Sequence, residues 1–212
     1  YVLQQLKQNS KTKVVVGVTE SPAVRSRGIS LDNGRKYFSV GWIKTLIKDM
    51  SWSNMNTLVL HFSEEMGLGI ESKTYPWLNG RYGDLGTNAA CTTDNTQITQ
   101  EQLAEIIAFA KLYHVEIIPS LDSPGHMNYI VRKFEEKSKD EAFSFTFNGA
   151  TYDVDQGKTI GSYYKYNGSG SYAKNKVTGT RNTSYSRGID ISDSTAVAFA
   201  KSLVKEYADL FK

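Results

Sequence analysis

Segments with the apolar pattern of a strand alternate along this chain with segments that have the apolar period of a helix, and this order constrains the fold most. Three short, mostly apolar runs predict strands at residues 27–32, 56–62 and 115–121. Amphipathic helices are predicted to follow residues that can cap them, namely Ser39, Thr99 and either Ser192 or Ser194. A strand–helix order repeated three times predicts an α/β fold with a parallel sheet, and a barrel is one of the two common closures of such a sheet.

Apolar positions in the three predicted helices recur every three or four residues and predict the face that each helix buries. They are Val40, Ile43, Ile47 and Met50 in the first helix, Leu103, Ile106, Ile107 and Ala110 in the second, and Ala200, Leu203, Val204, Tyr207 and Phe211 in the third. Thr99 and Gln102 have the spacing of a capping box, in which each side chain bonds the other residue's backbone N–H.

A long segment, about 127–191, separates the third predicted strand from the last helix. Its second half is rich in Tyr, Gly, Ser and Asn, and we expect a β-rich, hairpin-like insertion at about residues 140–190 on the loop face of the sheet. Tyr163, Tyr164 and Tyr166 either stack on a ligand there or pair across strands of the insertion.

The charge balance argues against some classes of partner. The 212 residues include 25 Lys and Arg against 22 Asp and Glu, whereas nucleic-acid and anionic-membrane binding normally needs a clustered basic excess. No apolar run approaches the ~20 residues of a membrane-spanning helix. The single cysteine, Cys91, cannot form a disulfide within the chain. We therefore expect neither nucleic acid nor membrane as a partner.

Polar side chains follow each predicted strand at its carboxyl end. They are Asp32 and Arg35 after the first strand, His61, Glu64 and Glu65 at the end of the second, and Asp122 and His126 after the third. In parallel sheets of this kind, ligands bind at the carboxyl ends of the strands. The three strand ends therefore predict one functional site.

The residue types at this site limit its chemistry. A histidine beside a carboxylate, such as His126, is held in one tautomer and can orient an acid. Arg35 offers a planar fork of donors for hydroxyls or a carboxylate. Glu64 and Glu65 are adjacent on an extended segment, so we expect them to point opposite ways and to make a poor acid–base pair.

A metal site is an alternative, because His61, Glu64, Asp122 and His126 are all of ligand type. No HxH or HExxH spacing places two histidines side by side, so we expect no metal and no cofactor. His61 is expected to be a packed histidine at a strand end.

Five segments together carry a family resemblance: "RGISLDNGRKYFS", "MNTLVLHFSEE", "TYPWL", "ITQEQLAEIIAFAK" and "IIPSLDSPGH". In this order and spacing they resemble the first half of the catalytic domain of glycoside hydrolase family 20, which contains the β-N-acetylhexosaminidases and the lacto-N-biosidases. The resemblance runs from about Arg27 to His126 and continues more weakly in the final helix. It implies the first three βα units of a (β/α)8 TIM barrel in residues 23–212. Residues 1–22, with a strand predicted at 13–18, would be a linker and the end of the small α/β domain that often precedes the barrel.

The resemblance implies a secreted or cell-surface hydrolase that removes a terminal N-acetylhexosamine or lacto-N-biose unit from a glycan with retention of configuration. In this family the substrate's own acetamido oxygen attacks the anomeric carbon, in place of an enzyme nucleophile. An adjacent Asp–Glu pair at the end of the fourth barrel strand assists, and the resemblance to the family stops before that strand. We therefore expect an amino-terminal portion of the barrel, inactive alone, whose partner is the remainder of the barrel.

Site residues follow from the resemblance position by position. Arg35 matches the arginine that binds hydroxyls of the terminal sugar, and Glu64 matches a position that is usually Asp. Asp122 and His126 match the Asp and His of the turn after the third strand. The family arrangement implies a relay in which Asp122 and Glu64 bias His126, and His126 biases the general acid. The segment "HFSEE" and the Tyr-rich insertion favour the lacto-N-biosidase side of the family.

Two other functions fit parts of the sequence. One is a metal-dependent hydrolase on the same barrel, with His61 and His126 as ligands. The other is a non-catalytic sugar-binding module in which Trp42, Trp52, Trp77 and the Tyr-rich loop are stacking platforms, although core packing is the default role of the three tryptophans.

Overall fold

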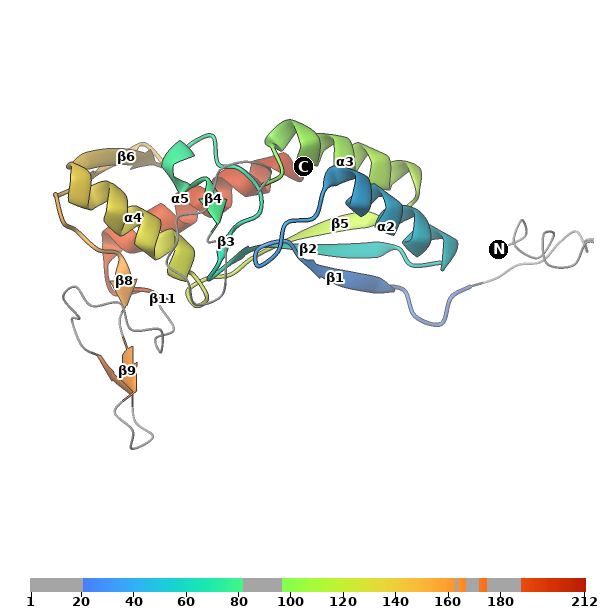
Figure 1. The fold of residues 1–212 in the computed structure, drawn as a ribbon, viewed down its shortest axis with the longest axis horizontal. Coiled ribbons are helices and arrows are strands. Elements are labelled where there is room, and N and C mark those ends of the chain that lie inside the picture. Colours follow the sequence, from blue (N-terminus) through green and yellow to red (C-terminus); the bar gives the residue numbers. More distant parts are fainter. Residues whose placement is uncertain (1–20, 82–96, 163, 167–171, 175–187) are drawn as a thin grey trace, which may run out of the picture.

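A parallel sheet of three strands organises the right half of the molecule in Figure 1. The computed structural model describes residues 21–81, 97–162, 164–166, 172–174 and 188–212. The strands are β1 (Gly28–Asp32), β2 (Thr57–Glu64) and β5 (Glu116–Leu121), and β2 pairs in parallel with both of the others. This confirms the three predicted strands and their parallel order. The strand predicted at 13–18, Cys91 and Tyr163 lie outside the described residues.

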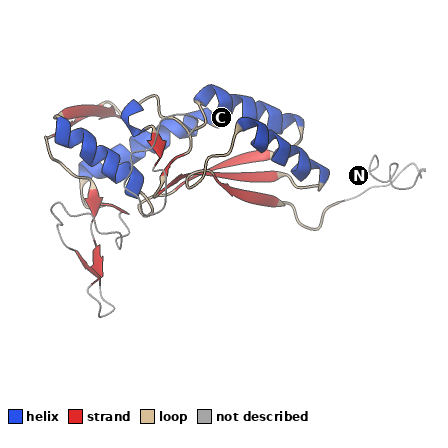
Figure 2. Ribbon diagram, viewed as in Figure 1, coloured by secondary structure: helices blue, strands red, loops and turns tan. Residues whose placement is uncertain are grey.

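Two helices, α2 (Val40–Trp52) and α3 (Gln100–Leu112), lie against one face of this sheet (Figure 2). Ser39 caps α2 by accepting a hydrogen bond from Trp42 N at 3.3 Å. The predicted capping box of α3 is confirmed, because Thr99 and Gln102 each bond the other residue's backbone N–H. The buried faces of the two helices are Ile43, Ile47 and Met50, and Leu103, Ile106 and Ala110.

The last helix, α5 (Ser194–Leu210), is capped by Asp193 and not by either predicted serine. The Asp193 carboxylate accepts from Thr195 N at 2.9 Å, and its negative charge suits the amino end of a helix. Leu203 and Tyr207 are buried as predicted, whereas Val204 is 45% exposed.

A helix that the sequence pattern did not predict, α4 (Asn128–Asp140), follows β5. Met127 at its amino end provides no side-chain cap, and its second half is mostly charged, so the usual start signal and a full apolar stripe are both missing. Its buried residues are Tyr129, Ile130, Val131, Phe134 and Ser138. The β-rich insertion therefore begins after α4 and not directly after β5.

Antiparallel pairs make up the described part of the insertion, as predicted. β6 (Phe143–Phe147) and β7 (Ala150–Val154) form a hairpin. β8 (Gly161–Ser162) pairs with β11 (Gly188–Ile189), and β9 (Tyr164–Tyr166) pairs with β10 (Tyr172–Lys174). Two further short strands, β3 (Gly67–Leu68) and β4 (Gly80–Arg81), extend the main sheet beyond β2, with the 3-10 helix η1 (Pro76–Leu78) between them.

Aromatic rings fill the space between η1, α4, α5 and the β6–β7 hairpin. Trp77 stacks on Phe199 with ring centroids 5.9 Å apart, which confirms its predicted core role. For Trp42 and Trp52 the core prediction is wrong, because they are 46% and 55% exposed. Ile43, Ile47 and Met50 occupy the buried stripe of α2 and leave both tryptophans outside it.

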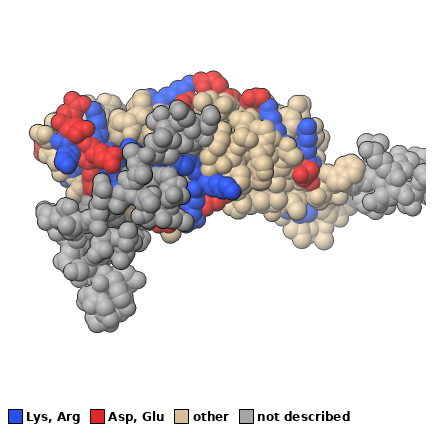
Figure 3. Space-filling view, in the orientation of Figure 1, with Lys and Arg blue, Asp and Glu red and all other residues tan. Residues whose placement is uncertain are grey.

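The barrel is not closed in this chain, because β1 and β5 each pair with one strand only among the described residues. β2 is buried along most of its length, but β5 is half exposed, with Ile118 at 40%. Lys and Arg side chains are interspersed with Asp and Glu on the face shown in Figure 3. None of the described helices is long and apolar enough to span a membrane.

Candidate active site

The carboxyl ends of the three parallel strands bring the predicted site residues together. Asp32 of β1 is in register with His61 of β2, and His61 is in register with Ser120 of β5. Arg35 follows β1 by three residues, and Asp122 directly follows β5. Because the strands are parallel, their polar ends share one edge of the sheet.

Glu64, the last residue of β2, is the centre of this cluster and is only 3% exposed. Its Oε1 lies 2.6 Å from Arg35 Nη2 and 3.3 Å from His61 Nε2. Its Oε2 lies 3.2 Å from His126 Nδ1 and accepts from Glu65 N at 3.1 Å. Burial of a carboxylate is costly unless it is paired and hydrogen-bonded, and these four neighbours provide that compensation.

A close approach between the loop after β1 and the end of β2 gives Glu64 its position. A Cβ atom at Gly34 would lie 2.9 Å from Glu64 Cβ, so only glycine fits here without displacement. Asp32 shapes the same turn, because its Oδ1 accepts from Gly34 N and Arg35 N at 3.1 and 2.9 Å. Its Oδ2 then accepts from Arg35 Nη1 at 2.8 Å, so Asp32 orients the guanidinium.

Arg35 is the charged group at the mouth of the cluster, with 41% of its side chain exposed. The hydrogen bond with Asp32, together with the charges of Glu64, Asp32 and Glu65, raises the pKa of Arg35. The guanidinium therefore stays charged, and its exposed part remains available to a ligand.

His126 lies at the opposite side of Glu64 and is 54% exposed in its side chain. Its backbone has a φ of 53°, in the left-handed region, which turns the chain back over β2 after Pro124–Gly125. Since a carboxylate only accepts, the contact with Glu64 assigns the ring proton to Nδ1. In the neutral ring this leaves the lone pair on Nε2.

Asp122 pairs with His61 and not with His126, which corrects the predicted order of the relay. Its Oδ2 lies 3.8 Å from His61 Nε2. The reason is local: Asp122 directly follows β5, next to the strand that carries His61, whereas the following turn carries His126 over Glu64. His61 was expected only to pack, yet it contacts Glu64, Asp122 and Ser120.

The prediction that Glu64 and Glu65 point opposite ways is wrong. β2 ends at Glu64, so the alternation of an extended strand does not continue to Glu65. Carboxylate oxygens of both residues lie within 4.8 Å of a His126 ring nitrogen, and Glu65 Oε1 is 4.0 Å from Arg35 Nε.

The returning end of the insertion supports the loop that carries His126. Ile189 N in β11 donates to Pro124 O at 2.8 Å. A Cβ atom at the preceding residue, Gly188, would lie 2.7 Å from the same carbonyl oxygen. The loop therefore rests on a strand more than sixty positions later in the sequence.

Comparison with known proteins assigns most of this chain to a family. Residues 25–212 match the model of the glycosyl hydrolase family 20 catalytic domain. The chain belongs to glycosyl hydrolase family 20.

Similar curated proteins are β-hexosaminidases from different organisms. The chain is 33% identical over 119 residues to β-hexosaminidase subunit A1 of Dictyostelium discoideum, a match that covers 56% of this chain and 21% of that protein. It is 33% identical over 111 residues to a β-hexosaminidase of Porphyromonas gingivalis, covering 52% and 14%. This chain therefore spans about a fifth of the length of the first curated relatives that it matches.

Solved family 20 structures share the fold. The exo-β-N-acetylglucosaminidase of Vibrio harveyi, in complex with N-acetylglucosamine, matches with a TM-score of 0.59 at 22% identity, over 91% of this chain and 26% of that one. A mutant β-hexosaminidase of Streptomyces plicatus, in complex with GlcNAc as product, matches with a TM-score of 0.56 at 19% identity, over 89% and 31%.

A metal ion does not suit the donors of this family 20 site. Two sets of three side chains have ligand atoms within 4.8 Å of one another, namely His61, Glu64 and Asp122, and Glu64, Glu65 and His126. Both sets depend on Glu64, whose oxygens already have four neighbours, including the Arg35 guanidinium at 2.6 Å. A cation bound beside Glu64 would lie close to the positive charge of Arg35, which disfavours it.

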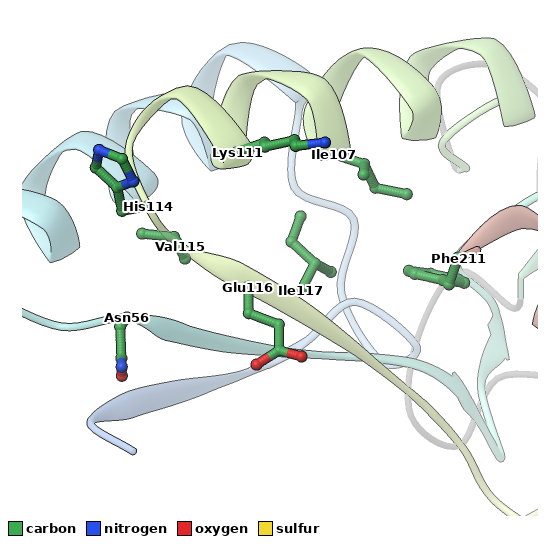
Figure 4. Close-up of a pocket in the computed structure, with 8 residues that line it drawn as sticks. All are labelled: Asn56, Ile107, Lys111, His114, Val115, Glu116, Ile117 and Phe211. Carbon is green, nitrogen blue, oxygen red and sulfur yellow. The ribbon is translucent and has the colours of Figure 1, made fainter. Parts of the chain in front are cut away.

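A cavity of about 490 Å³ lies at the other end of the strands (Figure 4). Asn56 and Glu116 mark its position at the amino ends of β2 and β5. Its apolar lining comes from Ile107 of α3, from Val115 and Ile117 beside and within β5, and from Phe211 directly after α5. It is separate from the cluster around Glu64.

Proposed function

We propose that this chain contributes the terminal-sugar site of a retaining, substrate-assisted glycosidase that releases N-acetylhexosamine or lacto-N-biose from glycans. Family membership supports this reaction class, and one geometric observation carries the proposal. Glu64 joins Arg35, a group that can hold a sugar, to His126, a group that can orient an acid, at 2.6 and 3.2 Å.

Arg35 binds hydroxyls of the terminal sugar in this proposal. Asp32 fixes one side of its guanidinium and Glu64 another, so the fork is oriented before a ligand arrives. The exposed N–H groups are then free to donate to adjacent hydroxyls.

His126 connects Glu64 to the general acid. Glu64 holds the proton on Nδ1, which leaves Nε2 to accept from or orient a carboxylic acid. Asp122 acts indirectly, because it contacts His61, and His61 contacts the Glu64 carboxylate that holds His126. No step in this scheme uses a metal or a cofactor.

We infer that further strands of the barrel, carrying the acid pair, complete the site along the outer edge of β5. Glu116 N donates to Asn56 O, and alternation along a parallel strand then turns the backbone groups of Ile117 outward. Pro119 shares that outward orientation and has no N–H, so it would leave one hydrogen bond to the further strand unmade. The cavity at the start of β5 lies where an adjacent parallel strand would begin.

Binding of N-acetylglucosamine to the 212-residue chain tests the sugar site. We expect Arg35→Ala to weaken binding by about tenfold or more, since a hydrogen bond to a charged group contributes roughly 1.5–3 kcal/mol. Chemical-shift titration of labelled protein measures this. Arg25→Ala is the matched control, because Arg25 is an exposed arginine before β1.

One observation favours a second candidate, a non-catalytic sugar-binding module. Trp42 is 46% exposed and lies 4.5 Å from Phe38 between ring centroids, which is a suitable stacking surface. Binding that survives Arg35→Ala but is lost in Trp42→Ala would replace the glycosidase site by this module.

A further inference from the structure

His61 is a half-buried imidazole near the end of an otherwise largely buried strand, with 15% of its side chain exposed. We propose that His61, held by Ser120, is a positioning residue that orients the Glu64 carboxylate towards His126. The role in catalysis rests on the proposed function, but the orientation itself does not.

Both ring nitrogens of His61 have partners. Nδ1 lies 3.0 Å from Ser120 Oγ, and Nε2 lies 3.3 Å from Glu64 Oε1 and 3.8 Å from Asp122 Oδ2. Two carboxylates on the Nε2 side require a donor there, so neutral His61 carries its proton on Nε2. Nδ1 then accepts from the Ser120 hydroxyl. A flipped ring would lose these hydrogen bonds, so the ring has one favoured orientation.

The Nε2–H group separates two negative charges. Oxygens of Glu64 and Asp122 and a ring nitrogen of His61 all lie within 4.8 Å of one another. Without a donor between them the two carboxylates would repel, and Glu64 would turn. Because Arg35 and His61 both hold Oε1, Oε2 is directed to His126 Nδ1.

The pairing of β2 with β5 makes this arrangement possible. His61 and Ser120 are direct partners in the parallel register, although 59 residues separate them in the sequence. His61 therefore links the end of β5 to the carboxylate at the end of β2, and both strands determine where His126 finds its partner.

The chain has three histidines, so ring-nitrogen NMR of the 15N-labelled 212-residue protein can test the proposal directly. We expect the Nε2–H tautomer for His61 and the Nδ1–H tautomer for His126 at a pH where both rings are neutral. His114→Gln assigns the third ring and is the control, because His114 lies at the distant cavity and its loss should leave the other two unchanged.

Substitutions then separate positioning from packing. His61→Phe retains a ring but removes the donor, and we expect His126 to lose its preference for Nδ1–H and N-acetylglucosamine affinity to fall about 2- to 10-fold. His61→Gln supplies an amide N–H and should restore both. Ser120→Ala is a milder change that should release the His61 ring if His61→Phe does not fold. Circular dichroism and thermal unfolding establish which variants are folded.

An Nδ1–H tautomer for His61 in the unmodified chain, or an unchanged His126 spectrum in a folded His61→Phe variant, would overturn the proposal. Failure of the sugar site gives a different pattern. The tautomers would then be as expected while N-acetylglucosamine binding is absent or independent of Arg35.

Discussion

Glu64 illustrates how much one residue can contribute at this site, because its two oxygens serve four neighbours from three strand ends. The resemblance places an aspartate at this position in most family members. With one methylene more than aspartate, the Glu64 carboxylate contacts both Arg35 and His126 from the last position of β2. A pocket built around this longer arm differs in shape from one built around aspartate.

Replacement of this carboxylate by an amide should be costly. In Glu64→Gln the amide oxygen can still accept hydrogen bonds. The amide NH2 group can only donate, and it would face groups that donate to the second carboxylate oxygen in the unmodified chain. We expect the free energy of unfolding to fall by about 1–3 kcal/mol, the cost of leaving buried polar groups unsatisfied. Urea unfolding at neutral pH measures the change.

Glu65→Gln is the matched control for that experiment, because Glu65 is 35% exposed in its side chain and lies 4.0 Å from Arg35, against 2.6 Å for Glu64. Equal stability of the Glu64 variant and the unmodified chain would contradict the central role of Glu64.

Sequence reasoning identified Arg35, Glu64, Asp122 and His126 because each follows an apolar strand, and the structure brings them to one edge of the sheet. It undervalued His61, since its importance depends on a register partner 59 residues away, and no local pattern reveals that register. The signal that was available is a polar residue within an apolar strand, matched by a serine in the neighbouring strand.

At the scale of elements, α5 ties together segments that lie far apart in the sequence. Glu206 accepts hydrogen bonds from Ser72 Oγ, from the backbone N–H groups of Lys73 and Thr74, and from Gln100 Nε2. Tyr207, on the next position of α5, donates to Ile70 O at 2.9 Å. Two consecutive residues thus attach the helix to the loop after β3 and to α3.

Burial, with the nearby charges of Glu206 and Glu71, raises the pKa of Tyr207 well above its usual value. The folded state therefore keeps a proton that the unfolded chain loses near pH 10. The stability from this group is complete below that pH and falls as pH rises above it. We expect alkaline destabilisation that is smaller in Tyr207→Phe, measured by urea unfolding between pH 8 and about pH 11.

Tyr37→Phe is the control for the alkaline series, because Tyr37 is only half-buried. At pH 7 the Tyr207→Phe variant should itself lose about 1 kcal/mol, since Ile70 O loses its donor. If the free energy of unfolding fell equally with pH in Tyr207→Phe and Tyr37→Phe, this account would be refuted.

Helices were predictable where the apolar period and a capping residue indicate the same starting point. Ser39 and Thr99 mark the starts of α2 and α3, and the apolar positions of those helices are the ones that the structure buries. α4 was missed because Met127 gives no capping signal, and its apolar residues are concentrated in the first half of the helix. The exposure of Trp42 and Trp52 shows that residue type alone does not decide burial.

At the scale of the whole molecule, no strand among the described residues pairs with the outer edges of β1 and β5, and the chain spans about a fifth of the length of related enzymes. Hydrogen exchange should reveal the outer edge of β5. We expect the amide of Ile117, which faces outward, to exchange faster than the amide of Ile118, which faces β2. Slow exchange at Ile117 in a monomer would exclude an open edge.

Catalysis should require more than this chain. We expect purified 212-residue protein to show no turnover of a chromogenic N-acetylglucosaminide or lacto-N-bioside, because the proposed acid pair belongs to a further strand. A full-length β-hexosaminidase assayed in parallel is the positive control. Measurable turnover by the chain, removed by Arg35→Ala, would show that an acid within these residues suffices.

The support that β11 gives to Pro124 links a remote stretch of sequence to the orientation of His126. Homologous enzymes that lengthen or shorten the stretch between α4 and β11 would have to keep its returning end in place, even where everything between is replaced. A change in that remote stretch would therefore shift the His126 ring without touching the strand ends that carry Arg35 and Glu64.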